Sequence, residues 1–115
     1  KGSIMISAFD GERLVGNASL SCVMERQKTL HRATFGMAML KSHWGQGLGK
    51  KILSEPITFA KQAGYELLEL EVAASNTTAV SLYQKMGFVV YGERPRSLKL
   101  KNGDYYDELL MVLKL

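Results

Sequence analysis

Three glycines at alternate positions, Gly45, Gly47 and Gly49, lie between a strand-like run and a helix-like run. Glycine lets a backbone turn tightly and come close to a ligand. The first turn of the following helix offers N–H groups that lack intrahelical partners, and the helix dipole favours an anion there. Lys50 and Lys51 add positive charge at the same end. The chain is therefore expected to contain a strand–loop–helix unit that can hold a phosphate group.

Two common phosphate-binding loops do not fit this spacing. A Walker loop needs four residues between its glycines and then Lys-Ser/Thr, whereas Gly45 and Gly49 enclose three residues and Lys50 is followed by Lys51. A dinucleotide-binding fingerprint needs Gly-x-Gly-x-x-Gly, and this loop has one residue fewer. On the loop alone, a glycine-rich turn without a ligand also stays open.

The residues around the loop predict three strands before it and one helix after it. Alternating hydropathy predicts strands at 3–9, 12–24 and 32–40. Gly36, inside the third run, indicates a bulge or a close approach of another group to the backbone. Apolar residues after the loop share one helix face, Pro56 interrupts or kinks that helix, and Gly64 is a plausible stop. The face consists of Leu48, Ile52, Phe59 and Ala63.

The second half of the chain predicts a strand, a helix and two more strands. Residues 66–73 alternate two kinds of side chain, as in a strand with two distinct faces. Ser75 or Asn76 then caps a helix over 77–86. Closing strands are predicted at 88–91 and 105–113, joined by a basic segment. The order of elements indicates a mixed α/β fold with antiparallel flanks and a parallel or splayed pair in the middle.

The segment from Asn76 to Phe88 is Asn-Thr-Thr-Ala-Val-Ser-Leu-Tyr-Gln-Lys-Met-Gly-Phe. It resembles the signature Asn-x-x-Ala-x-x-Leu-Tyr-x-x-x-Gly-Phe of the GNAT (Gcn5-related) N-acetyltransferase family at every fixed position. Gly47-Leu48-Gly49, 27 residues earlier, resembles the family's pyrophosphate loop, Arg/Gln-x-x-Gly-x-Gly/Ala, with Trp44 where Arg or Gln is usual. The resemblance covers about residues 10–115 and implies a central mixed sheet with splayed parallel strands, flanked by helices.

The family usually begins with a strand and one or two helices that form part of the acceptor site. Little of that pattern is visible before Ser3. We therefore expect residues 1–115 to be a single GNAT domain in which this first part is missing or short.

The resemblance also implies where acetyl-CoA binds. In the family it lies where two neighbouring parallel strands splay apart, here the strands ending near Met39 and Ala73. Backbone groups of Met37 and Met39 would bond the pantetheine arm as an added strand does. The side chain of Asn76 would bond the cofactor arm as well as cap its helix. Main-chain N–H groups would bind the pyrophosphate at Gln46, Gly47, Leu48, Gly49 and Lys50.

Two residues are the catalytic candidates. Tyr83 lies two helical turns after Asn76 on the same face, and the family motif implies that its phenol donates a proton to the leaving CoA thiolate. Glu71 is the candidate general base, because some peptide N-terminal acetyltransferases of the family carry Glu at this spacing before the Tyr. A carboxylate in a semi-buried cleft titrates nearer the working pH. A core tyrosine, a surface glutamate paired with a lysine, and Glu69 as the base stay open.

Composition bounds the class of protein. The 115 residues are 46% hydrophobic and 23% charged, as in one soluble globular core. No stretch approaches the roughly 18 apolar residues of a membrane span, and no signal-peptide pattern is present. Cys22 is the single cysteine, so no intrachain disulfide and no Cys cluster for zinc can form. These features predict a cytoplasmic protein with no membrane partner and no metal.

The net charge of +4 attracts anions. The basic residues are scattered, apart from a group at Arg94, Arg96, Lys99 and Lys101. That group is expected to lie in a solvated hairpin connection or to contact the acceptor. Because no Lys/Arg stripe with interleaved aromatic residues is present, a nucleic-acid partner is not expected.

Three functions follow in order of preference. The first is an N-acetyltransferase that moves the acetyl group of acetyl-CoA to a primary amine of a small molecule or peptide, by direct attack in a ternary complex. The alternative is a non-catalytic acyl-CoA-binding module, and the third is a basic nucleic-acid-binding domain with salt-dependent affinity. The family resemblance implies a monomer or homodimer.

Overall fold

The computed structural model describes residues 3–22, 29–40 and 47–115. These residues form six strands and two helices. The chain divides into two compact units, residues 1–68 with Leu115, and residues 69–114. Hydrogen-bonded neighbours give the strand order β1-β2-β3-β4-β6-β5. The predicted mixed α/β class is therefore confirmed, whereas the predicted splay between two parallel strands stays a prediction.

The first unit opens with an antiparallel meander of three strands. These are β1 (Ile4–Asp10), β2 (Arg13–Cys22) and β3 (Arg32–Met39). The turn after β1 is made by Gly11 in the left-handed conformation, φ 65°, as the Asp-Gly signal predicts. Alternate residues of β2 and β3 are buried because one face of the meander carries the apolar side chains. They are Ala18, Leu20, Ala33 and Phe35, whereas Val15 is buried outside this alternation, where the β1–β2 register shifts.

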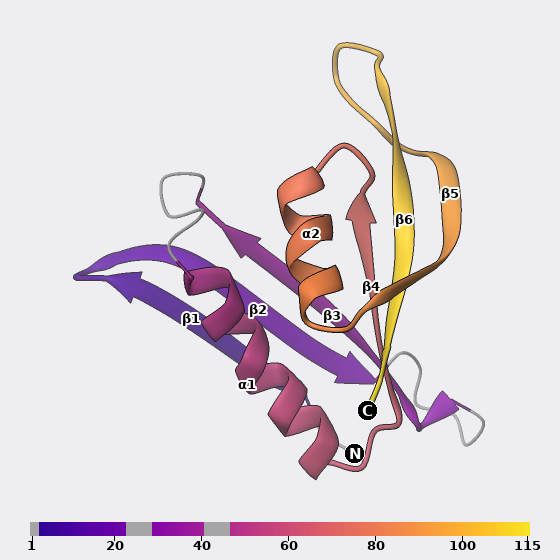
Figure 1. Ribbon diagram of the computed structural model, residues 1–115. Coiled ribbons are helices and arrows are strands. Elements are labelled where there is room, and N and C mark those ends of the chain that lie inside the picture. Colours follow the sequence, from indigo (N-terminus) through magenta and orange to yellow (C-terminus); the bar gives the residue numbers. More distant parts are fainter. Residues whose placement is uncertain (1–2, 23–28, 41–46) are drawn as a thin grey trace. The chain divides into compact units, whose positions relative to one another are not determined.

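Helix α1 (Leu48–Gln62) lies along this apolar face and contacts all three strands (Figure 1). The predicted face is only partly right, because Phe59 and Ala63 are half-buried. The helix instead buries Gly49, Ile52, Leu53, Pro56 and Ala60. Leu53 and Ala60, on this face, are fully buried.

Pro56 does not end the helix, which continues for six more residues in the same element. Its ring lacks an N–H for the carbonyl of Ile52, one turn earlier. The ring is buried, so the apolar contact offsets part of that loss. The hydroxyls of Ser54 and Thr58 donate to the carbonyls of Lys51 and Ser54, at 2.9 and 3.1 Å. Gly64 lies just beyond the helix with φ 86°, which confirms its predicted role as a stop.

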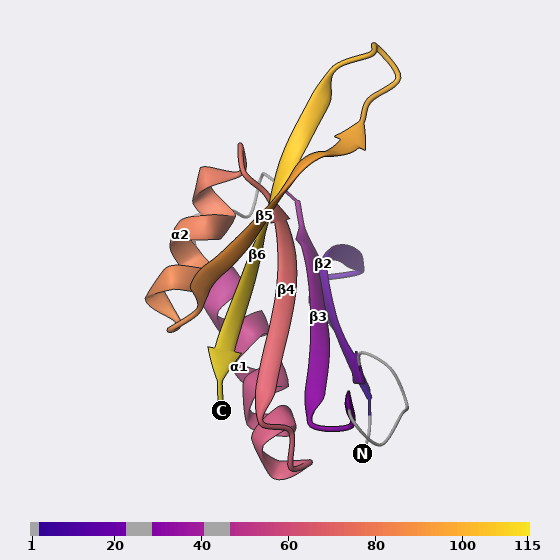
Figure 2. The same ribbon diagram turned by 90° about the vertical axis from the view of Figure 1, so that its right-hand side faces the viewer.

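The second unit contains most of β4 (Leu67–Ala73), α2 (Thr77–Lys85), β5 (Val89–Lys99) and β6 (Tyr105–Lys114). Its helix lies to one side of β4 and of the twisted β5–β6 hairpin (Figures 1 and 2). The two faces predicted for β4 are confirmed, because Leu70 and Val72 are buried whereas Glu71 is exposed. Leu68, from the part of the strand in the first unit, is fully buried.

Strand β5 is much longer than predicted. The sequence predicts a strand ending at residue 91 and a basic connection after it, whereas β5 pairs with β6 as far as Lys99. The pairing is not regular throughout, because the register shifts between Val90 and Gly92 and again between Arg94 and Leu98. The second shift contains Pro95, which has no N–H to donate, and Arg96, whose φ is 53°. The part of β5 after residue 91 is a strand because it pairs with β6, and local propensity carries no information about such pairing.

No helix among the described residues has the length and hydropathy needed to cross a membrane.

A glycine does mark a close approach, but at Gly16 rather than at Gly36. The β2–β3 register passes through Gly36 without a bulge, and a Cβ added there would meet only the Ser19 hydroxyl, at 3.6 Å. A Cβ added at Gly16 would lie 3.0 Å from Ile52 Cδ1 and 3.2 Å from the carbonyl oxygen of Ala38. The absence of a side chain at Gly16 therefore lets helix α1 pack close to β2.

Replacing Gly16 tests this contact. Gly16→Ala forces the Ala38 backbone or the α1 side chains to move, so we expect the free energy of unfolding to fall by about 1–3 kcal/mol. Gly36→Ala is the matched control and should change it by less than about 1 kcal/mol, because the added Cβ would make only an ordinary contact with the Ser19 hydroxyl. Urea unfolding followed by circular dichroism measures both variants. Equal effects of the two substitutions would contradict the packing described.

Candidate functional site

In the first unit, the start of α1 carries the candidate phosphate site. Gly47 is the N-cap and adopts the left-handed conformation, φ 78°, with no side chain to bond the helix start. The first turn contains no acidic residue, and Lys50 is exposed within it. The N–H groups of Leu48, Gly49 and Lys50 belong to the turn that has no intrahelical partners, while Lys51 N–H already donates to the Gly47 carbonyl at 3.3 Å. This arrangement suits an anion.

The neighbouring strand β3 presents the predicted backbone groups. Leu40 N–H donates to the Val15 carbonyl at 2.9 Å, so that pair is a hydrogen-bonded pair of the β2–β3 ladder. Such pairs alternate with non-hydrogen-bonded pairs in an antiparallel ladder. Met37 and Met39, opposite Ala18 and Gly16, fall in the second kind. Their N–H and C=O groups therefore face the side of β3 away from β2, which in the strand order is the side of β4.

The side chains of Met37 and Met39 are half-buried, which agrees with the expectation that they fill space. Gln46, predicted to bind the pyrophosphate, and Trp44, the departure from the family loop, lie outside the described residues.

In the second unit, Asn76 is the N-cap of α2. Its side-chain oxygen accepts the Ala79 N–H at 3.2 Å, so the predicted cap is confirmed and Ser75 is not the capping residue. An N-cap bond of this kind satisfies one of the helix's orphan donors. The side-chain NH₂ group of Asn76 is not engaged by that bond and provides two donors.

Tyr83 is the buried residue of α2, 5% exposed. Its ring meets Phe88 edge to face, with centroids 5.7 Å apart and an interplanar angle of 61°. Burial raises the pKa of the Tyr83 phenol to about 12, because the apolar surroundings disfavour the phenolate. The phenol therefore stays protonated throughout the neutral range and can act only as a donor there.

Glu71 does not lie in the semi-buried setting expected for a base. Its side chain is 51% exposed and forms a two-pronged ion pair with Arg94. Arg94 Nη1 lies 3.0 Å from Glu71 Oε2, and Nη2 donates to Oε1 at 3.2 Å. The hydrogen bond and charge of Glu71 raise the pKa of Arg94 above its usual range. The paired surface glutamate considered above is therefore what the structure contains, with Arg in place of Lys.

Nothing in the sequence indicates that a second carboxylate contacts Arg94. Glu108 stands opposite Arg94 in the β5–β6 register, and its Oε1 lies 3.4 Å from Nη1. The Ser97 hydroxyl donates to the same oxygen. Arg94 was visible in the sequence only as part of a basic group, because its partners come from strands 14 and 23 residues away.

Among residues 3–22, 29–40 and 47–115, no group of three or more His, Cys, Asp or Glu side chains is arranged to hold a metal ion.

The chain is similar to known proteins over most of its length. The family model described as "Acetyltransferase (GNAT) family" matches residues 1–88. The L-amino acid N-acyltransferase MnaT of Escherichia coli (strain K12) is 31% identical over 85 residues, which cover 74% of this chain and 49% of that protein. The chain thus spans about half the length of the curated relatives it matches.

Solved structures agree in fold. An acetyltransferase of the GNAT family from Streptococcus pneumoniae has a TM-score of 0.90 and 31% identity, over 98% of this chain and 67% of that one. The Salmonella typhimurium protein yncA, solved with its cofactor acetyl-CoA, has a TM-score of 0.87 over 99% of this chain and 65% of that one. Its 24% identity limits that likeness to the fold.

The raised pKa of Tyr83 predicts a pH dependence of stability. Below pH 10 the phenol is protonated in both the folded and the unfolded chain, and its contribution to the free energy of unfolding is fully present. Between pH 10 and about 12 only the unfolded chain loses the proton, so the contribution falls by roughly 3 kcal/mol as the pH rises. Denaturant unfolding of Tyr83→Phe should show a correspondingly smaller fall over this range. Tyr105→Phe, at a 43% exposed ring, should follow the parent; parallel curves for all three proteins would contradict the burial effect.

Proposed function

The chain belongs to the GNAT family of acetyltransferases, and we propose that it transfers the acetyl group of acetyl-CoA to a primary amine by direct attack in a ternary complex. The relative named as an L-amino acid N-acyltransferase supports an amine of small-molecule size as the acceptor. The whole protein's substrate is part of this proposal, because the matched region is about half of that relative.

The observation that carries the proposal is the glycine-led start of α1. Gly47 turns the chain without a side-chain cap, and the following N–H groups meet no acidic residue in the first turn. Gly47, Leu48, Gly49 and Lys50 would bind the cofactor's pyrophosphate there through their main-chain N–H groups. Met37 and Met39 would bond the pantetheine arm through the groups that face away from β2. Gln46 and the Asn76 amide complete the proposed set.

In the proposed reaction, an ammonium acceptor first gives a proton to a base, for which Glu71 is the candidate. The amine then attacks the thioester carbon, the C–S bond breaks, the nitrogen loses its second proton to water, and the departing CoA sulfur takes up one proton. The buried Tyr83 phenol is protonated at neutral pH and would donate to that sulfur. Because its pKa of about 12 exceeds that of an ordinary thiol, about 8.5, its main effect is a hydrogen bond that stabilises the developing thiolate.

Calorimetric titration with acetyl-CoA, CoA and ATP tests cofactor binding. We expect acetyl-CoA and CoA to bind with micromolar affinity and ATP not to bind. Lys50→Glu puts a negative charge beside the anion and should weaken acetyl-CoA binding at least tenfold. That substitution also suits the helix dipole, so it should not unfold the chain.

Lys61→Glu is the matched control, with the same charge change in the last turn of the same helix. It should leave the affinity within about twofold of the parent. Absence of acetyl-CoA binding by a folded chain, or equal loss in both variants, would overturn the assignment of the loop.

Release of CoA thiol, followed with an amine panel, tests catalysis. Tyr83→Phe removes the donor while keeping the ring, so acetyl-CoA affinity should persist and kcat should fall by about 10²-fold or more. Tyr105→Phe, distant along the chain in the exposed hairpin, should not change kcat. Binding of acetyl-CoA without thiol release for any amine, with Tyr83→Phe indistinguishable from the parent, would instead support the non-catalytic acyl-CoA-binding module.

A further inference from the structure

One arginine of the second unit holds two carboxylates that differ in accessibility. Arg94 contacts Glu71 through both terminal nitrogens and Glu108 through one of them. The Glu108 side chain is 14% exposed, whereas those of Glu71 and Arg94 are 51% and 48% exposed. Glu108 is also held by the Ser97 hydroxyl. Arg94 therefore has one anchored partner and one partner on the solvent side.

The anchored partner orients the guanidinium. Glu108 lies directly opposite Arg94 on β6, so this pair is a cross-strand contact built into the hairpin register. Nη1 is thereby held in place while the edge formed by Nη1 and Nη2 points at Glu71. A guanidinium edge with two parallel N–H donors matches a carboxylate in shape as well as charge. The chain thus presents an oriented carboxylate-binding fork.

The solvent-side partner can be exchanged. Both ions are well hydrated when apart, so an exposed ion pair of this kind can be replaced by another carboxylate. An incoming carboxylate can make the same two hydrogen bonds with Arg94 as Glu71 does. When it does so, the Glu71 carboxylate, until then in contact with Arg94 at 3.0 and 3.2 Å, is released next to the incoming group.

We propose that Arg94 binds the carboxylate of a free α-amino acid acceptor in exchange for Glu71, which then receives the acceptor's ammonium group. This inference rests on the proposed acetyltransferase function and names its acceptor class. An α-amino acid carries its negative and positive groups on one carbon, so they can meet Arg94 and Glu71, which are adjacent. A polyamine has no group for Arg94, and a peptide N-terminus has its carboxylate far away.

The exchange also decides when Glu71 acts as a base. While Arg94 holds both of its oxygens, the side of the carboxylate that faces the guanidinium is occupied. After exchange, one N–H proton of the acceptor ammonium passes to a Glu71 oxygen, and the nitrogen keeps the electron pair with which it attacks the thioester. Glu71 later gives that proton to water. No other reactant is needed, and proton abstraction occurs only with a carboxylate-bearing acceptor in place.

Binding measured without turnover tests the proposal. The guanidinium NMR signals of Arg94, assigned by their loss in Arg94→Gln, are followed in the full chain with and without saturating CoA. The probes are the twenty common L-amino acids and their amides. At least one amino acid should shift the Arg94 signals saturably, and its amide should bind roughly 10- to 100-fold more weakly, as loss of a charged hydrogen-bonded pair predicts.

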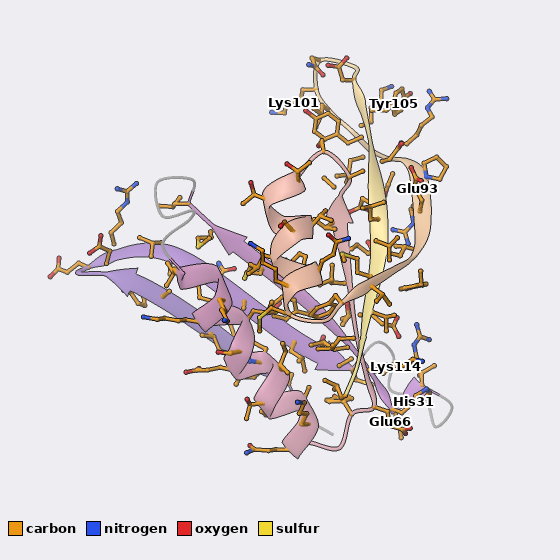
Figure 3. The ribbon with its side chains drawn as sticks, in the orientation of Figure 1. His31, Glu66, Glu93, Lys101, Tyr105 and Lys114 are labelled. Atoms are coloured by element: carbon orange, nitrogen blue, oxygen red, sulfur yellow. The ribbon has the colours of Figure 1, made fainter. Side chains whose placement is uncertain are left out.

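Variants separate recognition from folding. Arg94→Gln should abolish the preference for the acid over the amide, and Arg94→Lys should restore only part of it, because Lys cannot form the fork. Arg96→Gln is the matched control. Its guanidinium lies 4.0 Å from the ring centroid of Tyr105, and Figure 3 shows Tyr105 near the tip of the hairpin. It should keep the parent's preference.

Equal binding of acid and amide, or no effect of any amino acid on Arg94 in a folded chain, would overturn the proposal. Failure of the acetyltransferase function has a different signature. It appears as absent acetyl-CoA binding or absent thiol release with every amine, whatever the Arg94 signals show.

Discussion

The contact of α1 with the apolar face of β2 and β3 is the constraint on which the first unit depends. Gly16 lacks the Cβ that would collide with Ile52 and with the Ala38 backbone, so the helix can lie close to the strand. Ile52, Leu53, Pro56 and Ala60 are buried as a result. The same packing orients the helix start, where Gly47 turns the chain and the free first-turn N–H groups begin. A candidate anion site therefore depends on how closely a helix approaches a strand.

A similar dependence joins packing to chemistry in the second unit. Burial of Leu70 and Val72 on β4 requires the intervening Glu71 to face the opposite side, since side chains alternate along a strand. There its carboxylate forms an ion pair with Arg94, which lies opposite Glu108 in the β5–β6 register and contacts it as well. A candidate base and a carboxylate-binding fork are thus neighbours because of strand pairing. The arrangement needs side chains from β4, β5 and β6 together.

The two candidate catalytic residues differ in how far they are buried. Tyr83 is 5% exposed, and burial keeps its phenol protonated as a donor needs to be. Glu71 is half-exposed, and its carboxylate is held by Arg94 rather than enclosed by apolar groups. The expectation that the Glu71 carboxylate lies in a semi-buried cleft is therefore wrong. An exchangeable arginine replaces the apolar cleft as the feature that would control the proposed base.

The sequence by itself determined the order of elements, the glycine turn before α1, the Asn76 cap and the alternation of β4, because these depend on neighbours within a few residues. The match from Asn76 to Phe88 also indicated the family. Only the tertiary structure decided which face α1 buries, that Gly16 and not Gly36 marks the close approach, and that β5 continues to Lys99. It alone brought Glu71, Arg94 and Glu108 together. Those outcomes depend on contacts between segments distant in the chain, which no local pattern encodes.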